Sequence, residues 1–235
     1  MDGSIFLNFI VWYLVFLFST SLHEAAHAAA AALGGDDTGI GGGQATLNPI
    51  PHIQREKVGM VLAPIVSFFL MRGSWMFGWA SVPFNPFWAA RHPKRAFVMS
   101  LAGPLSHLVP ALLSWLCMVI GMRYGYFAPD FGALHPASAA DPSNSVAAAL
   151  ALILSVMFKL NLVLCIFNLL PFPPMDGSEA WYLLVRAEED RLRLRHTLAS
   201  YGPAGLLLAW WAFPRVFAPV FGFFIRQLLR FGMGL

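Results

Sequence analysis

Charged residues are scarce in this sequence of 235 residues. They make up 11% of the chain, whereas about 25% is usual in soluble globular domains, and 58% of the residues are hydrophobic. This composition excludes a soluble protein and predicts one embedded in the lipid bilayer. The 15 Lys and Arg nearly balance the 12 Asp and Glu, and the charges are spread through the connecting segments. We therefore expect no nucleic-acid partner.

Cysteine is scarce too. Cys117 and Cys165 both lie within apolar runs, where a free cysteine behaves as a small hydrophobic residue. They predict neither a disulfide framework nor a zinc site made of cysteines. The first apolar run has no basic segment before it and is longer than the roughly 7–15 residues of a signal-peptide core. We expect this run to remain in the mature protein.

Long apolar runs, by contrast, are abundant. Five of them approach or exceed the ~20 residues that cross a bilayer. They span residues 5–33, 58–80, 96–122, 146–170 and 202–225. The chain is therefore predicted to be an all-α polytopic membrane protein.

Three connectors carry structural signals of their own. A glycine-rich connector contains a strand-like piece, Gln44 to Leu47, which predicts a strand or a small β hairpin. The connector 123–145 is rich in proline and predicts a surface loop. In 178–200, charged and apolar residues interleave at helical spacing, which predicts an amphipathic helix on the membrane surface.

The first apolar run contains the motif H-E-x-x-H, formed by His23, Glu24 and His27. Residues i and i+4 share one face of a helix, so both imidazoles can bind one metal ion, and neutral imidazoles suit zinc. Glu24 would stand beside the ion, where a carboxylate can take a proton from water whose pKa zinc lowers to about 7. Two other interpretations are hydrogen bonds within a helix bundle and a metal or proton pathway in a transporter. The cost of ionisable groups at membrane depth disfavours a packing role alone.

A catalytic zinc ion normally has three protein ligands, so a third must come from elsewhere in the chain. The best candidate is Asp176, at the end of the proline-rich segment that follows the fourth apolar run. Prolines there break the helix, and the freed backbone groups must line a cavity or the protein interior. The alternative is that Asp176 and Gly177 form a simple turn at the membrane surface.

Four motifs in this order resemble the site-2 protease family of intramembrane zinc metalloproteases. They are H-E-x-x-H at 23–27, LNPIPH at 47–52, AGPLSH at 102–107 and FNLLPFPPMDG at 167–177. The chain is most similar to the compact bacterial and archaeal members, which lack PDZ and CBS domains. The resemblance extends from about His23 to Gly177.

The resemblance implies a role for each matching residue. His23, His27 and Asp176 match the zinc ligands, and Glu24 matches the general base. Asn168 matches an asparagine that steadies the substrate carbonyl or its oxyanion, a task suited to an amide donor. Asn48 and His52 lie in a loop that the family has near its active site, which implies a supporting role.

Two residues depart from the expected pattern. His107 stands where the family often has asparagine, and it is predicted to make an interhelical hydrogen bond, with a stray metal contact as the alternative. Lys159 lies midway along the run 146–170, where a lone lysine should face the bundle or pair with a group such as Asn161.

The metal site constrains the topology. If His23 and Asp176 bind one ion, both must lie near the same membrane face, which requires an odd number of crossings between them. Of the two intervening runs, 58–80 is the weaker because it contains a proline, an arginine and glycines. We predict that 58–80 is re-entrant or interfacial, which leaves four full transmembrane helices. Ten Lys and Arg then lie on the active-site face against three opposite, whereas five crossings would give seven against five.

The sequence therefore predicts an intramembrane zinc endopeptidase with one Zn²⁺ ion. Its substrate would be a membrane protein cleaved in or near a transmembrane helix, as in regulated intramembrane proteolysis, and its active site would face the cytoplasm of a bacterial or archaeal cell. Residues 1–177 would form the protease core, and 178–235 an amphipathic surface helix and a C-terminal transmembrane helix. A substrate segment could pair with the strand predicted at 44–47. The alternative is a metal-handling membrane protein or an inactive protease homologue.

Overall fold

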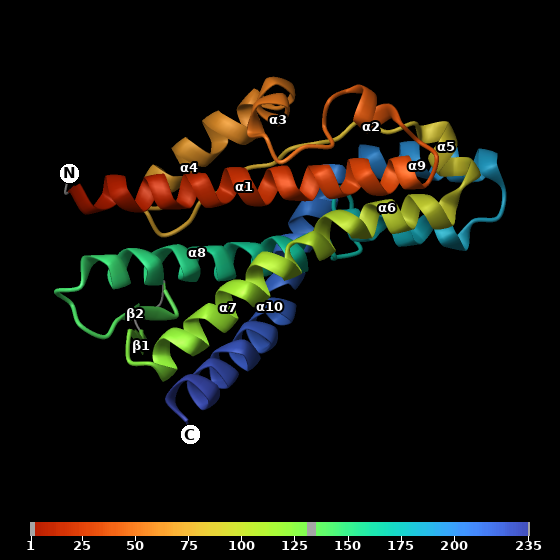
Figure 1. The fold of residues 1–235 in the computed structure, drawn as a ribbon. Coiled ribbons are helices and arrows are strands. Elements are labelled where there is room, and N and C mark those ends of the chain that lie inside the picture. The colour runs from red at the N-terminus through yellow and green to blue at the C-terminus, as the bar shows by residue number, and fades with distance from the viewer. Residues whose placement is uncertain (1–2, 131–134, 235) are drawn as a thin grey trace.

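The computed structural model describes residues 3–130 and 135–234, which form a bundle of long helices (Figure 1). Four helical stretches of the described chain are long and apolar enough to cross a membrane. They are α1 (Gly3–Leu33), α6 and α7 taken together (Pro93–Ser106 and Leu108–Arg123), α8 (Ser145–Asn168) and α10 (Gly202–Met233). The prediction of an all-α polytopic membrane protein with four full spans is confirmed.

The apolar run 58–80 does not form a fifth span. It folds as a π-helix η1 (Val58–Leu62) continued by α4 (Ala63–Leu70), and together they reach about 20 Å, well short of a ~30 Å hydrocarbon core. The chain then turns at Gly73, whose φ is +79°, and runs back beside η1, where Trp79 N donates to Gly59 O at 3.1 Å. A Cβ on Gly59 would overlap Trp79 O, so only glycine allows this close return.

The span formed by α6 and α7 is interrupted at His107. Pro104 lies inside α6 and has no N–H to donate to Ser100 O, and the next turn closes with a 3₁₀-type bond from His107 N to Pro104 O at 3.3 Å. The two halves have different partners: α6 packs on α1, and α7 packs on α8 and α10. His107 therefore lies at the level where the α1 side of the bundle meets the α8 side.

A small β hairpin is present, but not where the sequence predicted one. β1 (Phe127–Pro129) pairs antiparallel with β2 (Ala137–Ala139), with Phe127 opposite Ala139. The prediction of a strand at 44–47 is wrong, because these residues form bends between α2 (Thr38–Gly41) and α3 (Pro49–Arg55). Likewise the surface loop predicted at 123–145 contains the hairpin, and its residues 131–134 lie outside the described part of the chain.

Local hydrogen bonds explain the bends. The Gln44 side chain donates to Gly42 O and Pro51 O, both at 3.3 Å, and the Asn48 side chain accepts from Ile50 N to cap α3. The Gln44 side-chain N and the Asn48 side-chain O thus bond within the segment itself, which favours a compact loop over an extended strand.

The prediction of a single amphipathic helix over 178–200 is also wrong. A short α5 (Pro86–Arg91) packs against this region, which consists of a 3₁₀ helix η2 (Asp176–Leu184) followed by α9 (Glu188–Ser200). None of the residues of α9 is buried, and its arginines and leucines alternate around the helix instead of forming an apolar face.

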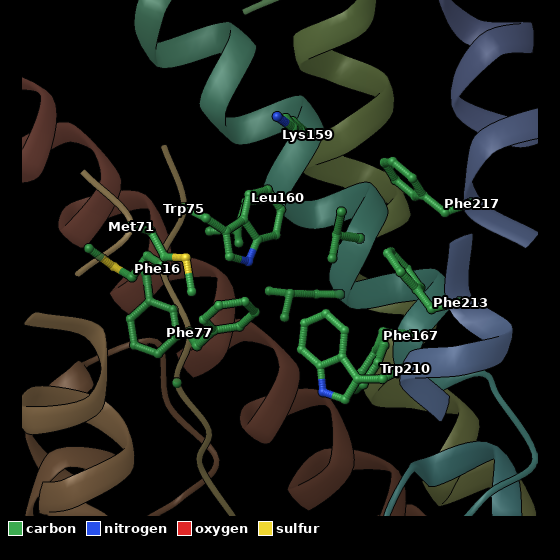
Figure 2. A pocket seen from close by; sticks show the side chains of 14 residues that line it. Phe16, Met71, Trp75, Phe77, Lys159, Leu160, Phe167, Trp210, Phe213 and Phe217 are labelled. Carbon is green, nitrogen blue, oxygen red and sulfur yellow. The ribbon is translucent and has the colours of Figure 1, made fainter. Parts of the chain in front are cut away.

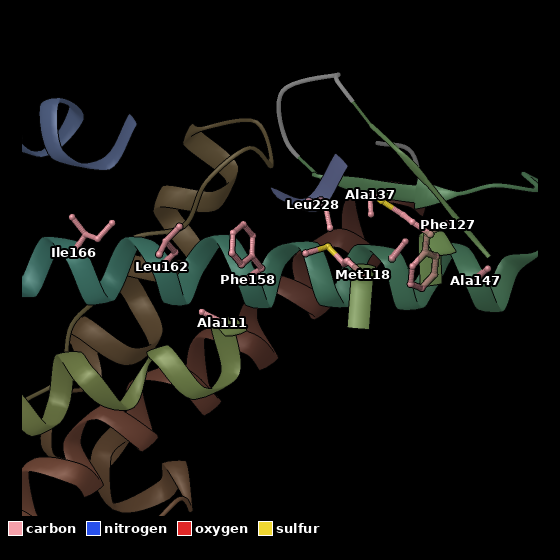
Figure 3. Packing of buried hydrophobic residues seen from close by; sticks show 11 residues of the cluster. Ala111, Met118, Phe127, Ala137, Ala147, Phe158, Leu162, Ile166 and Leu228 are labelled. Atoms are coloured by element: carbon pink, nitrogen blue, oxygen red, sulfur yellow. The ribbon is translucent and has the colours of Figure 1, made fainter. Parts of the chain in front are cut away.

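The largest apolar cluster lies where α7, α8 and α10 meet, beside the β hairpin. Figure 3 shows its side chains along α8, with Phe158 near the centre and Ala111, Met118 and Leu228 arriving from α7 and α10. Phe158 is fully buried and its ring packs against Phe224 at a centroid distance of 5.7 Å. This packing holds α8 rigidly, and the C-terminal end of α8 leads directly into the segment that contains Asp176.

Candidate metal centre

The H-E-x-x-H residues lie near the C-terminal end of α1, on a turn that faces the bundle interior. His23, Glu24 and His27 are all buried. The two imidazole rings have their centroids 4.5 Å apart, at an angle of 84°. This is the i, i+4 geometry that the sequence predicts, with both rings on one face of the helix.

Asp176 is brought to these histidines by a sharp reversal of the chain after α8. A Cβ on Gly177 would overlap Leu169 O, so the reversal requires glycine at this position. On its other side, Ser100 Oγ in α6 donates to the backbone O of Asp176 at 2.8 Å. The Asp-Gly pair is therefore more than a surface turn, because it is fixed against both α8 and α6.

Three ligand atoms converge at this point. His23 Nε2 lies 2.9 Å from His27 Nε2, and Asp176 Oδ2 lies 3.2 Å from His23 Nε2 and 3.4 Å from His27 Nε2. Ligands about 2.05 Å from a tetrahedral zinc ion are separated by about 3.3 Å, close to these distances. In addition, Asp176 Oδ2 is buried without a hydrogen-bond donor among the described residues. A buried carboxylate oxygen facing two imidazole nitrogens fits a divalent cation.

The other ring nitrogen of His27, Nδ1, has a hydrogen-bond partner. His27 Nδ1 lies 2.8 Å from Met99 O in α6, and because a carbonyl oxygen only accepts, Nδ1 must carry the proton. The lone pair of His27 is then left on Nε2, which faces Asp176. This is the tautomer that a metal ligand requires.

Glycine at position 103 allows α6 to cross close to both ligands. A Cβ there would overlap His27 Nε2 and would lie 2.8 Å from His23 Cε1. The glycine of the AGPLSH motif thus leaves the space that the ligand atoms occupy.

The two predicted catalytic residues, Glu24 and Asn168, lie in different surroundings. Glu24 is 4% exposed and close enough to His27 for an electrostatic interaction. Asn168 is the last residue of α8, and its side-chain N donates to Leu164 O of the same helix at 3.0 Å. The role of Asn168 toward a substrate carbonyl stays a prediction.

The supporting residues have structural roles in this structure. Asn48 caps α3, and the buried His52 bonds through Nε2 to Thr46 O at 2.9 Å. Both contacts lie within residues 46–52, at the start of α3.

Two further groups lie near the centre. The interhelical hydrogen bond predicted for His107 is confirmed, whereas the contact of Glu179 was not predicted from the sequence. His107 Nε2 lies 3.0 Å from His23 Nδ1, which makes it the interhelical hydrogen-bond partner of a predicted zinc ligand. Glu179, three residues after Asp176, forms a bidentate ion pair with Arg195 of α9, whose guanidinium lies 4.2 Å from the Tyr182 ring centroid. Glu179 and Arg195 are 16 positions apart and lie in different helices, η2 and α9, so no local sequence signal connects them.

A largely apolar cavity of about 430 Å³ lies between α1, the returning segment 71–78, α8 and α10. Figure 2 shows Phe16, Phe77, Phe167 and Trp210 around it, with Lys159 projecting from α8. The Lys159 ammonium lies 5.3 Å from the Trp75 ring centroid, a cation–π contact that favours its charge in apolar surroundings. Phe167 precedes Asn168, so the cavity approaches the C-terminal end of α8.

Similarity to known proteins covers most of the chain. The model of peptidase family M50 matches residues 11–209. A protein of Bacillus subtilis (strain 168), described as "Putative zinc metalloprotease YwhC", is 33% identical over 168 residues. The matched part is 70% of this chain and 65% of that protein, so the chain spans slightly less than two thirds of this relative. No solved structure matches the chain.

Proposed function

Because the chain belongs to peptidase family M50, we propose that it is an intramembrane zinc endopeptidase that cleaves a membrane-protein substrate in or near a transmembrane segment. The family membership confirms the resemblance to site-2 proteases and, with the description of the relative, supports a zinc metalloprotease. The observation that carries the proposal is the convergence of His23, His27 and Asp176 from two distant parts of the chain. Four apolar helices support an integral membrane protein.

Metal binding and proton transfer are assigned to different residues of the centre. His23, His27 and Asp176 would hold the zinc ion, which supplies a Lewis acid that polarises the substrate carbonyl and makes water more acidic. The Glu24 carboxylate takes the proton of the attacking water and delivers it to the leaving amine, as a general base and then a general acid. Burial of Glu24 keeps this carboxylate out of bulk water.

The surroundings of the centre support a hydrophobic substrate. The cavity beside α8 is lined almost entirely by apolar side chains, as suits the side chains of a transmembrane segment. A helical peptide bond is shielded by its own hydrogen bonds, so the substrate must unwind locally before it is attacked. Residues 44–47 cannot pair with the unwound segment as a strand, because they form bends.

The proposal is tested with purified protein in detergent. Wild type and Glu24→Gln are compared for zinc content and for cleavage of a test substrate with one transmembrane helix, and the exposed Glu189→Gln of α9 is the matched control. We expect zinc in all three proteins and cleavage by wild type and Glu189→Gln only. Zinc in all three without any cleavage would favour the alternative of a metal-handling protein or an inactive homologue.

The orientation with the active site toward the cytoplasm is part of the same proposal. Its support is the excess of Lys and Arg on the active-site face. The count from the sequence is ten against three, but Arg72 adjoins Gly73, whose O accepts from Asn8 near the N-terminal end of α1, so the structure leaves nine against four. In a background without Cys117 and Cys165, a membrane-impermeant thiol reagent added to intact cells should label Ser143→Cys, near the hairpin, and spare Ser200→Cys of α9. The reverse labelling would overturn this orientation.

A further inference from the structure

The two predicted histidine ligands are held by α6 in different ways. Met99, Gly103 and His107 are spaced four residues apart and therefore share one face of α6, which is directed at the metal centre. The backbone carbonyl of Met99 bonds to His27. The missing side chain of Gly103 leaves room for both histidine rings. The imidazole of His107 bonds to His23. Among the described contacts, His23 thus depends on a side chain where His27 depends on the backbone.

The hydrogen bonds around His23 form a chain with one consistent direction. His23 Nε2 faces Asp176, so when this nitrogen binds a metal its proton must be on Nδ1. Nδ1 then donates to His107 Nε2 at 3.0 Å, and His107 must carry its own proton on Nδ1. That proton is donated to Asn161 Oδ1 at 2.8 Å.

Asn161 completes the chain on α8. Its side-chain N donates to Ser19 Oγ of α1 at 2.9 Å and to Met157 O at 2.8 Å. Both donors of the amide and its oxygen are therefore used, and the orientation of the amide is determined. Asn161 and Ser19 are fully buried and His107 is 1% exposed, so water does not compete for these bonds.

We propose that His107 is a positioning residue for zinc, which accepts the Nδ1 proton of His23 and, oriented by Asn161, fixes the ring and the tautomer of this ligand. The inference rests on the proposed zinc site and adds to it a supporting residue at a position where the resembling family often has asparagine. Partners of this kind usually contribute about 10–100-fold to metal affinity. One imidazole spans the gap between His23 on α1 and Asn161 on α8.

Zinc affinity in purified variants tests the role of the side chain. Competition with a chromophoric chelator should show about 10–100-fold weaker zinc binding by His107→Leu, which cannot accept the proton. His107→Gln, whose amide can accept from His23 and donate to Asn161, should stay within a few-fold of wild type. His196→Leu removes an exposed histidine of α9 and should leave zinc affinity unchanged. Equal zinc affinity in wild type and a folded His107→Leu would overturn the proposal.

A second measurement needs no substitution. In the zinc-loaded wild-type protein, ¹⁵N NMR of histidine should show His107 protonated at Nδ1 only and His23 protonated at Nδ1 with Nε2 bound to metal. A His107 protonated at Nε2 would overturn the proposal, whatever the variants do. Absence of zinc from the wild-type protein would instead overturn the proposed function, so the two failures are distinguishable.

Discussion

Gly103 of α6 lies directly against His27 of α1, so closely that a single methyl group at Gly103 would occupy the space of His27 Nε2. The contact joins two of the four motifs that identify the family, H-E-x-x-H and AGPLSH. It explains in steric terms why a glycine is needed 76 residues after the histidine that it faces. The candidate metal centre therefore depends on the close approach of the α6 backbone as well as on its three side chains.

Substitution of this glycine should impair metal binding more than folding. In Gly103→Ala the new methyl group must displace the His27 ring, so we expect at least about 10-fold weaker zinc binding, as for loss of a residue that orients a ligand. Gly222→Ala in α10, where the nearest atom to a Cβ is the end of the flexible Arg226 side chain at 3.4 Å, is the control. Wild-type zinc affinity in Gly103→Ala would contradict the close packing of α6 on α1.

The ion pair between Glu179 and Arg195 should stabilise the segment that carries Asp176. Loss of one partner of a buried pair usually costs about 3–5 kcal/mol, because the other charge stays buried and unpaired. Arg195→Met should therefore lower the thermal unfolding temperature in detergent markedly. Arg193→Met, which removes an exposed arginine of the same helix, should change it little.

The loss of stability in Arg195→Met should depend on pH. Burial raises the pKa of the Glu179 carboxyl, and Arg195 acts in the opposite direction, so without Arg195 the carboxyl binds a proton more readily. A pKa raised in the folded state gives stability that is present at low pH and lost as the pH rises through that pKa. Arg195→Met should thus be closer to wild type at pH 5 than at pH 8. A deficit that is larger at pH 5 would refute this explanation.

Asp36 should stabilise the loop that follows α1. Burial acts to raise the pKa of its carboxyl, but the hydrogen bonds donated by Thr38 and by the backbone of Asn85 outweigh burial and lower it. The stability that Asp36 contributes is then present above its unfolded pKa of about 3.9 and lost as the pH falls through its lower folded value. Asp36→Ala should unfold at a lower temperature than wild type at pH 7, and the difference should shrink below pH 4. The exposed Asp190→Ala is the control.

The spans, and the placement of His23 and His27 on one helix face, were predictable because both follow local rules. An apolar run of about 20 residues and a four-residue spacing of histidines are properties of one segment. Asp176 lies 149 residues after His27, so no spacing connects the two. It was chosen because prolines break the helix before it, and the resemblance to a family then implied its role.

What the sequence did not predict depends on tertiary contacts. The hairpin at 127–139 has only three residues in each strand, too few for a clear alternation of apolar and polar residues. The bends at 44–47 result from the side-chain bonds of Gln44 and Asn48, which compete with strand formation. His107 was recognised as a departure from the family pattern, but its bond to His23 depends on how α6 crosses α1.

The most direct test of the account is X-ray absorption spectroscopy of zinc in the purified wild-type protein and in Asp176→Asn. The account predicts one zinc ion per chain in the wild type, with two imidazole nitrogens and a carboxylate oxygen at about 2.0–2.2 Å and no sulfur ligand. In Asp176→Asn the zinc content should fall or the oxygen shell should change. Absence of zinc from the wild type, a sulfur ligand, or an identical spectrum for the two proteins would contradict the metal centre formed by His23, His27 and Asp176.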